Sequence, residues 1–430
     1  MSGDTPNTSN QQRWLQYAPK PPDRGDNSYD VFISYRSSDR SWAMALYDAL
    51  KLAGWDPFLD QYDLVPGSDL ETSLSEALEA SSSGVILWSS RTRDSEWCKR
   101  ERNAMRTLKD RTGTFNYVFA KLDNERLPLF AQSDLYLDFE NSPEGPRGEK
   151  HLRLICGMKG AALASEAVAM AQQVDRAVNE ALVAIQGAVD AENPDRLLQL
   201  GKTEEPDILA SPAPVLAAAQ GLISMGLYEE SLEVLKHAGV HFPQSLRAKQ
   251  LEGLALRRLK RYQAAIDVLS ELKAAGHQDP ETLGILAAAW DGRYQGSGKK
   301  LHLRRSRELY RTAFQGDPGD YYTGINAASK SLFLGESDEA ARLATLVMPL
   351  VEAASDGEDF WAGCTLGEVY LLQNNLDAAA AQYQKVIDKH PAQIGDLAGT
   401  RQQAKRICTA LELSDENIQK VLAPFELLDG

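Results

Sequence analysis

The segment Ser95–Glu101 places a carboxylate one helical turn after a tryptophan. If the segment starts a helix, the four-residue spacing puts the indole of Trp97 and the carboxylate of Glu101 on the same face. A flat apolar wall beside a negative charge can hold a charged ring and stabilise positive charge that forms next to it. Three basic neighbours favour the ionised carboxylate: Lys99, Arg100 and Arg102.

The same segment also has a purely structural interpretation. Glu96 and Glu101 can be first-turn acids that compensate the helix dipole, and Trp97 can belong to the core. Cys98 suggests a nucleophile, but residues 1–150 contain no histidine, so a cysteine–histidine mechanism lacks its base. The segment therefore favours a charge-stabilising carboxylate, and the structural alternative stays open.

Short apolar runs alternate with helical patterns up to about residue 160. The predicted strands cover 31–33, 55–59, 84–88, 117–122 and 135–139, and the predicted helices cover 40–53, 70–80, 97–109 and 149–158. This alternation predicts a parallel sheet with helices on both faces. Ligands of such sheets bind beyond the carboxyl ends of the strands, which selects the loops 34–39, 60–68 and 89–96.

After about residue 160 the sequence is rich in alanine and leucine and shows no strand signal. Tyr228 and Tyr262 stand 34 residues apart in similar contexts, and this is the period of tetratricopeptide helical hairpins. The clearest unit spans 360–391, in which Gly367 and Ala379 allow close helix approach while Tyr383 fills the remaining space. An irregular helical bundle is the alternative.

Two further features of the helical part are expected from the same pattern. A degenerate repeat is predicted over 328–350, with Gly335 at its turn and Ala340 at the close contact. An insertion loop is predicted over 292–300.

Composition and charge limit the function classes. The chain has 430 residues, 43% of them hydrophobic and 25% charged, which indicates a globular protein of two or three domains. The formal net charge of -15 argues against a nucleic-acid binder. The sequence offers no signal segment and no long apolar stretch, so a cytoplasmic location without membrane partners is expected. Its four cysteines are dispersed, so no disulfide framework and no metal site is expected.

Four segments together resemble the Toll/interleukin-1 receptor (TIR) domain. They are YDVFISYRSSD, FLDQYDLVPGSDL, SGVILWSS and SEWCKRE, in this order within residues 28–160. The resemblance implies a flavodoxin-like parallel sheet. It also implies one of two functional classes, an enzyme that cleaves the nicotinamide–ribose bond of NAD+ or a scaffold that only self-associates. Enzymatic members carry a glutamate at the position of Glu101, which scaffold members often lack.

The resemblance implies that Glu101 is the catalytic residue. Cleavage releases neutral nicotinamide, so no general acid is needed, and one carboxylate can stabilise the oxocarbenium character of the ribose. NAD+ is then the substrate, and no cofactor is expected. The residues expected to bind it are Tyr35, Arg36, Ser37, Asp60, Gly67 and Trp97. Two reservations apply to these residues: Arg36 can equally be a surface arginine, and Asp69 stands near the position where the axon-degeneration enzyme has an aromatic residue.

Residues 201–430 resemble tetratricopeptide proteins. Within them, Asp279–Glu336 resembles the helical TRAF-binding region of stress-activated kinases and bacterial multidomain proteins. Such arrays bind peptides or proteins on a concave surface. The fusion implies a sensor that controls TIR self-association, and through it NAD+ cleavage, in bacterial immune defence. A nucleoside-processing enzyme on a similar sheet is a third, less favoured class.

The predicted organisation is therefore a disordered tail over 1–27, a TIR domain over 28–160, connecting helices over 161–200 and a repeat domain over 201–430. The expected fold class is a flavodoxin-like α/β sheet followed by an all-α tetratricopeptide-like solenoid. The product, ADP-ribose or a cyclic isomer, stays open.

Overall fold

A computed structural model describes the chain in two compact units, Met1–Leu259 and Lys260–Gly430. The described residues are 18–23, 25, 27–36, 39–59, 70–90, 92, 96–127, 136–142, 145–243, 245–354, 359–391 and 394–428. Most of the predicted tail lies outside them. Near the end of this tail, the carbonyl of Pro19 accepts a hydrogen bond from the indole of Trp55, and the carbonyl of Pro21 accepts one from the ammonium of Lys159.

Unit 1 begins with a five-stranded parallel sheet in the order β2-β1-β3-β4-β5. The strands are β1 (Val31–Ser34), β2 (Pro57–Phe58), β3 (Ser83–Trp88), β4 (Asn116–Lys121) and β5 (Tyr136–Asp138). The direction in which strands are added reverses beside β1, so β1 and β3 flank the topological switch point. This is the flavodoxin-like order, and it confirms the predicted fold class.

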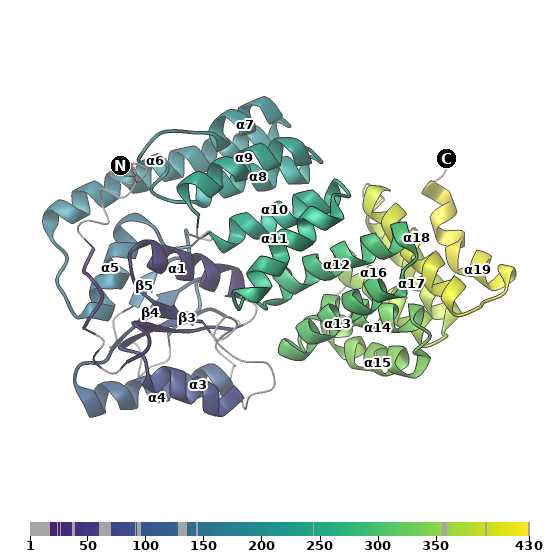
Figure 1. Cartoon of the computed structure of the whole chain (residues 1–430), viewed down its shortest axis with the longest axis horizontal. Coiled ribbons are helices and arrows are strands. Elements are labelled where there is room, and N and C mark those ends of the chain that lie inside the picture. Colours follow the sequence, from purple (N-terminus) through teal and green to yellow (C-terminus); the bar gives the residue numbers. More distant parts are fainter. Residues whose placement is uncertain are drawn as a thin grey trace, which may run out of the picture. The chain divides into compact units, whose positions relative to one another are not determined.

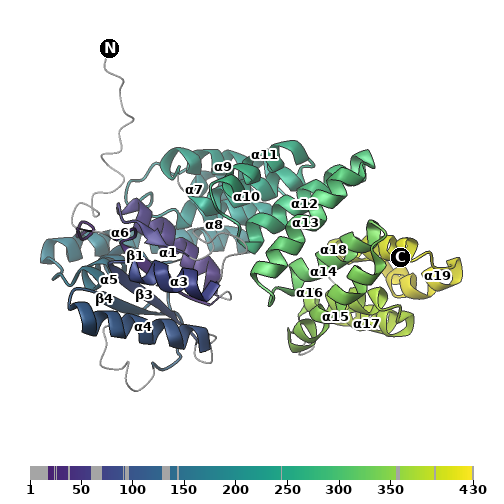
Figure 2. The same ribbon diagram turned by 60° about the horizontal axis from the view of Figure 1, so that its bottom comes forward.

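Helices cover both faces of the sheet (Figures 1 and 2). On one face lie α3 (Leu70–Glu79) and α4 (Glu96–Thr112); on the other lie α1 (Arg40–Leu52) and α5 (Gly148–Lys159). Alternate strand residues such as Phe32 and Phe119 pack against Leu78 of α3 and Met105 of α4. All four residues of β1 and all six of β3 are buried, as a sheet covered on both faces requires.

A glycine in β3 lets α4 approach the sheet. A Cβ at Gly84 would lie 2.7 Å from the sulfur of Met105, a distance at which the two atoms collide. Met105 stands one helical turn beyond Glu101, so this close contact also sets how near Glu101 comes to the end of the neighbouring strand β1.

The helical part of unit 1 continues from the α/β domain without a strand in its described residues. Its helices are α6 (Ser165–Asp190), α7 (Pro194–Gly201), α8 (Ala213–Ser224), α9 (Tyr228–His241) and α10 (Leu246–Arg258). Val174 and Val178 of α6 pack with Leu152 of α5. Asp175 of α6 accepts a 2.9 Å hydrogen bond from the backbone N–H of Glu149, which satisfies a free donor at the start of α5.

Unit 2 is a series of helices. They are α11 (Tyr262–Ala274), α12 (Pro280–Ser297), α13 (Lys300–Gly316), α14 (Tyr321–Phe333), α15 (Ser337–Ala354), α16 (Phe360–Leu372), α17 (Leu376–Lys389), α18 (Ile394–Ala410), α19 (Asp415–Leu422) and the 3-10 helix η4 (Ala423–Leu428). Consecutive helices pack together from α11 to α17, while α18 packs against α14, α16 and α19. Tyr228 and Tyr262, which suggested the period, each begin a helix. The predicted tetratricopeptide-like solenoid is confirmed.

Small residues set the helix spacing in the predicted unit 360–391. A Cβ at Gly367 would lie 2.4 Å from the ring of Tyr383, which is 1% exposed. The degenerate unit predicted over 328–350 is longer than expected, since it consists of α14 and α15 and spans 321–354. Gly335 lies at its turn with φ +85°, a conformation that favours glycine.

The prediction of an insertion loop over 292–300 is wrong. Helix α12 continues to Ser297, and α13 begins at Lys300. Gly292 is a packing residue, because a Cβ there would lie 2.3 Å from the ring of Tyr262. The glycine at the start of the predicted loop therefore marks close helix packing.

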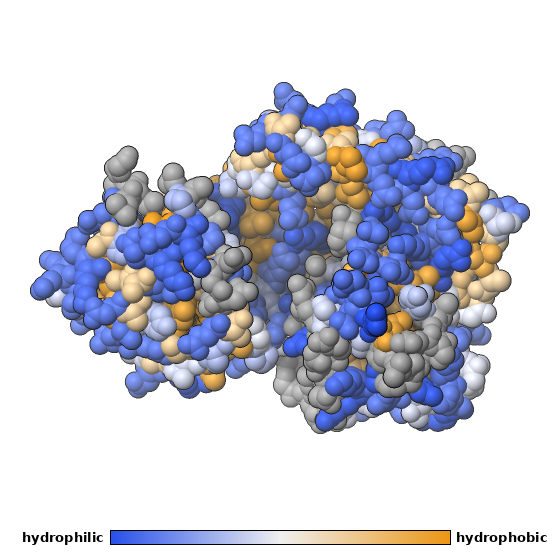
Figure 3. All heavy atoms as spheres, turned by 180° about the vertical axis from the view of Figure 1, so that it is seen from behind, coloured by the Kyte–Doolittle hydropathy of each residue, from blue (hydrophilic) through white to orange (hydrophobic). Residues whose placement is uncertain are grey.

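Hydrophilic residues cover most of the face drawn in Figure 3, with smaller hydrophobic patches between them. No helix among the described residues combines the length and apolar character needed to cross a membrane.

Candidate functional site

A buried serine at the end of β1 holds the carboxylate that the sequence singled out. The hydroxyl of Ser34 donates a 2.6 Å hydrogen bond to Oε2 of Glu101 in the second turn of α4. Ser34 is 1% exposed and Glu101 is half-buried. The bond joins residues 67 positions apart, at the carboxyl end of a strand that flanks the switch point.

A second polar network ties together the loops that follow β1 and β3. Asp39 occupies the N-cap position of α1 but makes no side-chain capping bond. Its Oδ2 instead accepts hydrogen bonds from the hydroxyls of Ser89, at 2.6 Å, and Thr92, at 3.2 Å. All three side chains are buried. Buried and mutually bonded groups of this kind fix the two loops relative to each other.

The loop after β3 is also bonded to the loop after β4. The backbone N–H and the hydroxyl of Ser90 both donate to Oδ2 of Asp123, at 2.8 and 2.7 Å. Burial raises the pKa of Asp123, but the hydrogen bonds from Ser90 and the charge of Lys121 outweigh it, so the net pKa is lowered. Hydrogen bonds thus link the loop after β3 to the loops after both neighbouring strands, β1 and β4.

The structure brings part of the predicted site together. Tyr35 and Arg36 follow Ser34 directly, Tyr35 buried and Arg36 exposed. The carbonyl of Arg36 accepts a 2.8 Å hydrogen bond from the backbone N–H of Asp39, which closes the turn after β1. Cys98 is 4% exposed. The backbone of Trp97 lies in the first turn of α4. Its side chain lies outside the described part of the structure, as do the residues Ser37, Asp60 and Gly67.

The sequence selected the loops 34–39 and 89–96 but did not single out the residues that organise this edge within them, namely Ser34, Asp39, Ser89 and Thr92, and it missed Asp123. A signal for the first four was present. Each is polar and follows an apolar strand run directly or within a few residues, in the segments VFISYRSSD and VILWSSRT. Such positions at the ends of parallel strands face the ligand edge.

Helix α1 of the α/β domain contacts the first helical hairpins of the same unit. Asp48 accepts hydrogen bonds from the backbone N–H of Leu246 and from the hydroxyl of Ser245, at the start of α10. Burial raises the pKa of Asp48 to about 7, although these hydrogen bonds lower it. The contact between the two parts of unit 1 therefore titrates near neutral pH.

This titration predicts a pH-dependent effect of Asp48→Asn. Between the unfolded pKa of 3.8 and the folded pKa of about 7, the folded protein keeps a proton that the unfolded chain releases. Its stability therefore falls as pH rises through this window and stays reduced above it. Asparagine cannot ionise, so the melting temperature of Asp48→Asn relative to the unmutated protein should rise from pH 5 to pH 8. Asp110→Asn, an exposed change on α4, is the control. An equal offset at both pH values would contradict the assignment.

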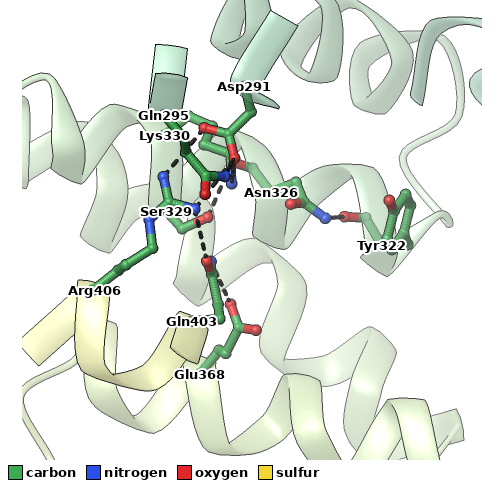
Figure 4. Close-up of polar contacts among 9 residues, drawn as sticks. All are labelled: Asp291, Gln295, Tyr322, Asn326, Ser329, Lys330, Glu368, Gln403 and Arg406. Atoms are coloured by element: carbon green, nitrogen blue, oxygen red, sulfur yellow. Dashed lines mark hydrogen bonds and ion pairs between the residues drawn. The ribbon is translucent and has the colours of Figure 1, made fainter. Parts of the chain in front are cut away.

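A buried polar cluster joins four helices of unit 2 (Figure 4). Asp291 of α12 accepts two hydrogen bonds of 3.2 Å from Arg406 of α18 and lies 3.7 Å from Nζ of Lys330 in α14. The side chains of Asp291 and Lys330 are 10% and 4% exposed. Burial raises the pKa of Asp291, but the charges of Lys330 and Arg406 outweigh it and the net pKa is lowered.

The second acid of the cluster is Glu368 of α16. It accepts a 3.4 Å hydrogen bond from Gln403, and burial raises its pKa to about 7 despite the opposing cations. Near neutral pH, Lys330 and Arg406 therefore face one full and one partial negative charge. Both cations lie over the ring of Phe333. Its centroid is 5.5 Å from Nζ of Lys330 and 4.6 Å from Cζ of Arg406. The cluster connects helices that begin successive hairpins, and α14, α16 and α18 also contact one another.

Two family models match separate parts of the chain. Residues 31–155 match the TIR domain, and residues 225–333 match the family described as Tetratricopeptide Repeats-Sensor. The first match contains both Ser34 and Glu101. The second covers α9–α14 completely, including Asp291 and Lys330.

Two known proteins are similar to the N-terminal part. One is the "Probable 2' cyclic ADP-D-ribose synthase BdTIR" of Brachypodium distachyon, 39% identical over 79 residues, which are 18% of this chain and 35% of that protein. The other is "Toll-like receptor 4" of Pinctada imbricata, 28% identical over 136 residues, 29% of this chain and 15% of the receptor. The chain thus spans about a third and about a seventh of these relatives.

Among solved structures, a thermophilic TPR protein of Thermus thermophilus is similar to the helical part. It is 21% identical with a TM-score of 0.38, and the match covers 47% of this chain and all of that protein. The consecutive hairpins and the matched residues 225–333 carry the repeat assignment. The chain therefore contains a TIR domain at its N-terminal end, followed by a tetratricopeptide-like sensor repeat domain.

Proposed function

We propose that the TIR domain cleaves the nicotinamide–ribose bond of NAD+ with Glu101 as the catalytic carboxylate. The observation that carries this proposal is the 2.6 Å hydrogen bond from Ser34, which holds the carboxylate at the ligand edge of the sheet. The similarity to a plant protein named a cyclic ADP-ribose synthase supports the same class of substrate.

The proposed reaction needs a negative charge and no proton donor. As the bond between C1′ of the ribose and nicotinamide breaks, both bonding electrons leave with the neutral nicotinamide. The positive charge that develops on the ribose is stabilised by Glu101. A hydroxyl oxygen, from water or from the substrate itself, then bonds to C1′ and releases its proton. NAD+ is the substrate in this proposal, and because the leaving group is neutral the chemistry requires no cofactor.

The remaining substrate contacts are part of the proposal. Arg36 is suited to the pyrophosphate, since a guanidinium binds phosphate oxygens in pairs, and it is exposed beside the end of β1. The other residues proposed to contact the substrate are Tyr35, Ser37, Asp60, Gly67 and Trp97.

Ser34 is proposed as a positioning residue. Ser34→Ala removes the hydrogen bond to Glu101 with almost no change in volume, so the carboxylate should lose its fixed orientation. We expect kcat to fall about tenfold, the size of effect produced by one hydrogen bond of about 1.4 kcal/mol, with little change in KM. Ser34→Thr keeps the hydroxyl and should retain more activity than Ser34→Ala. Equal kcat values for Ser34→Ala and the unmutated protein would remove Ser34 from the mechanism.

We further propose that association of TIR domains, controlled by a protein or peptide bound to the repeat domain, raises the activity. Repeat arrays present extended surfaces for such partners. The test follows nicotinamide release from NAD+ across a range of protein concentrations, with association state measured in parallel. A rate per subunit that rises with association supports the proposal. Association without release at any concentration favours a scaffold that signals only by contact.

The product is proposed to be ADP-ribose, a cyclic isomer or both, and chromatography of the same reactions distinguishes them. The proposed setting is bacterial immune defence by NAD+ depletion. Its support is the pairing of the TIR domain with a sensor repeat domain.

A further inference from the structure

Two histidines one helical turn apart lie beside a glutamate in unit 1, away from the TIR edge. His237 and His241 stand at positions i and i+4 in the last turns of α9, and Glu204 follows α7 in the connecting loop. Nδ1 of His237 lies 3.8 Å from Oε1 of Glu204, and Nε2 of His241 lies 3.8 Å from Oε2. The three side chains therefore converge on one point.

The second nitrogen of His237 fixes the orientation of its ring. Nε2 lies 2.9 Å from the backbone carbonyl of Thr203, and a carbonyl can only accept, so this nitrogen carries the proton. The lone pair of His237 is then on Nδ1, the atom that faces Glu204. Metal-binding histidines are characteristically oriented by such a bond from their other nitrogen.

The distances fit a small tetrahedral cation. One ligand atom from each residue lies within 4.8 Å of the other two. Bonds of 2.0–2.2 Å around tetrahedral zinc require ligand atoms about 3.3–3.6 Å apart. The two 3.8 Å distances must shorten by about 0.2–0.5 Å, and a pair at the 4.8 Å limit by about 1.2–1.5 Å. Glu204, whose side chain is 77% exposed in a loop, can move toward the histidines.

We propose that His237, His241 and Glu204 form a binding site for a divalent transition metal, with zinc as the favoured ion. Two imidazoles and one carboxylate suit zinc better than calcium or magnesium, which prefer oxygen ligands. Water completes the fourth position. The bound ion ties the α7–α8 loop to the end of α9. The dispersed cysteines led to the expectation of no metal site. The feature of the sequence that points to this proposed site is the i, i+4 spacing of His237 and His241.

Zinc binding to the full-length, untagged protein tests the site by calorimetry at neutral pH. One zinc ion per chain is expected, with a melting temperature that rises with zinc concentration. Loss of an orienting partner outside the ligand set already weakens metal sites about 10- to 100-fold, so His241→Gln should weaken binding by at least about 100-fold. Glu204→Gln should weaken it as well, and its exposed loop position leaves the fold undisturbed.

His390→Gln is the matched control, since this histidine lies at the end of α17 in unit 2. It should leave the affinity and the stoichiometry unchanged. Binding that is equally tight in His241→Gln, Glu204→Gln and His390→Gln overturns the proposal, as does an unmutated protein that binds no zinc. Replacing zinc with magnesium or calcium should give no comparable shift in melting temperature. Acidification below the histidine range should release the ion, because protonated imidazole cannot bind it.

Discussion

Glu101→Gln is expected to reduce nicotinamide release from NAD+ by about 100- to 1,000-fold, the loss typical when one preorganised group that stabilises transition-state charge is removed. The substitution keeps the size of the side chain. Its amide oxygen can still accept the hydrogen bond from Ser34, so the arrangement at the end of β1 should survive. Only the charge is lost, and the charge is what the proposed mechanism uses.

Asp110→Asn provides the matched control, because it removes one negative charge from an exposed position on the same helix. Its rate should equal that of the unmutated protein. Each variant is assayed at several concentrations with its association state measured, so that failure to assemble is separated from failure in chemistry. Retention of full activity by an assembled Glu101→Gln protein would exclude Glu101 as the catalytic residue.

The second large effect is expected in unit 2, where Asp291→Asn should destabilise the repeat domain by about 3–5 kcal/mol, as breaking a buried charge pair does. Asp291 is the carboxylate between Lys330 and Arg406, and Lys330 is almost completely buried. Asparagine has nearly the same shape but leaves Glu368, whose pKa is about 7, as the remaining acid beside the two cations. Because the pKa of Asp291 is lowered, its contribution is present at neutral pH and is lost on acidification below the unfolded value of 3.8.

Hydrogen exchange on the full chain measures this effect where it occurs, since a chain of two units need not unfold in one step. Protection should fall in α12, α14 and α18, the helices that carry Asp291, Lys330 and Arg406. Lys330→Met in the Asp291→Asn background should recover part of the loss, because it removes one of the two cations whose main counter-charge is gone. Asp377→Asn is the control. Its exposed pair with Lys420 contributes at most about 1 kcal/mol, and an equal effect of both substitutions would contradict the assignment.

Sequence reasoning predicted the element types well and their limits less well. Apolar runs identified all five strands, but Trp55–Leu59 was expected as a strand where β2 contains only Pro57 and Phe58. Gly292 shows the limit of local rules. A glycine inside a helical pattern signals either a break or a close contact, and only the ring of Tyr262 against it decides between them.

The candidate site was partly accessible to the same reasoning. Glu101 was selected by its spacing from Trp97 and by the TIR resemblance, and the structure places it at the edge that the strand order predicts. Its role, the other site residues and the domain boundaries stay predictions. Ser34 was missed because a serine after an apolar strand is common, and no local pattern says which side chain it will meet.

By itself, the sequence determined the class of each segment: a parallel α/β domain, helical hairpins after it, and a carboxylate one turn into a helix. These properties follow from periodicity and turn chemistry, which act over a few residues. Only the tertiary structure decided which distant residues meet. Ser34 and Glu101 are 67 residues apart, and Asp291 and Arg406 are 115 apart. Such pairs depend on strand order and helix packing, which the whole chain sets through its buried contacts.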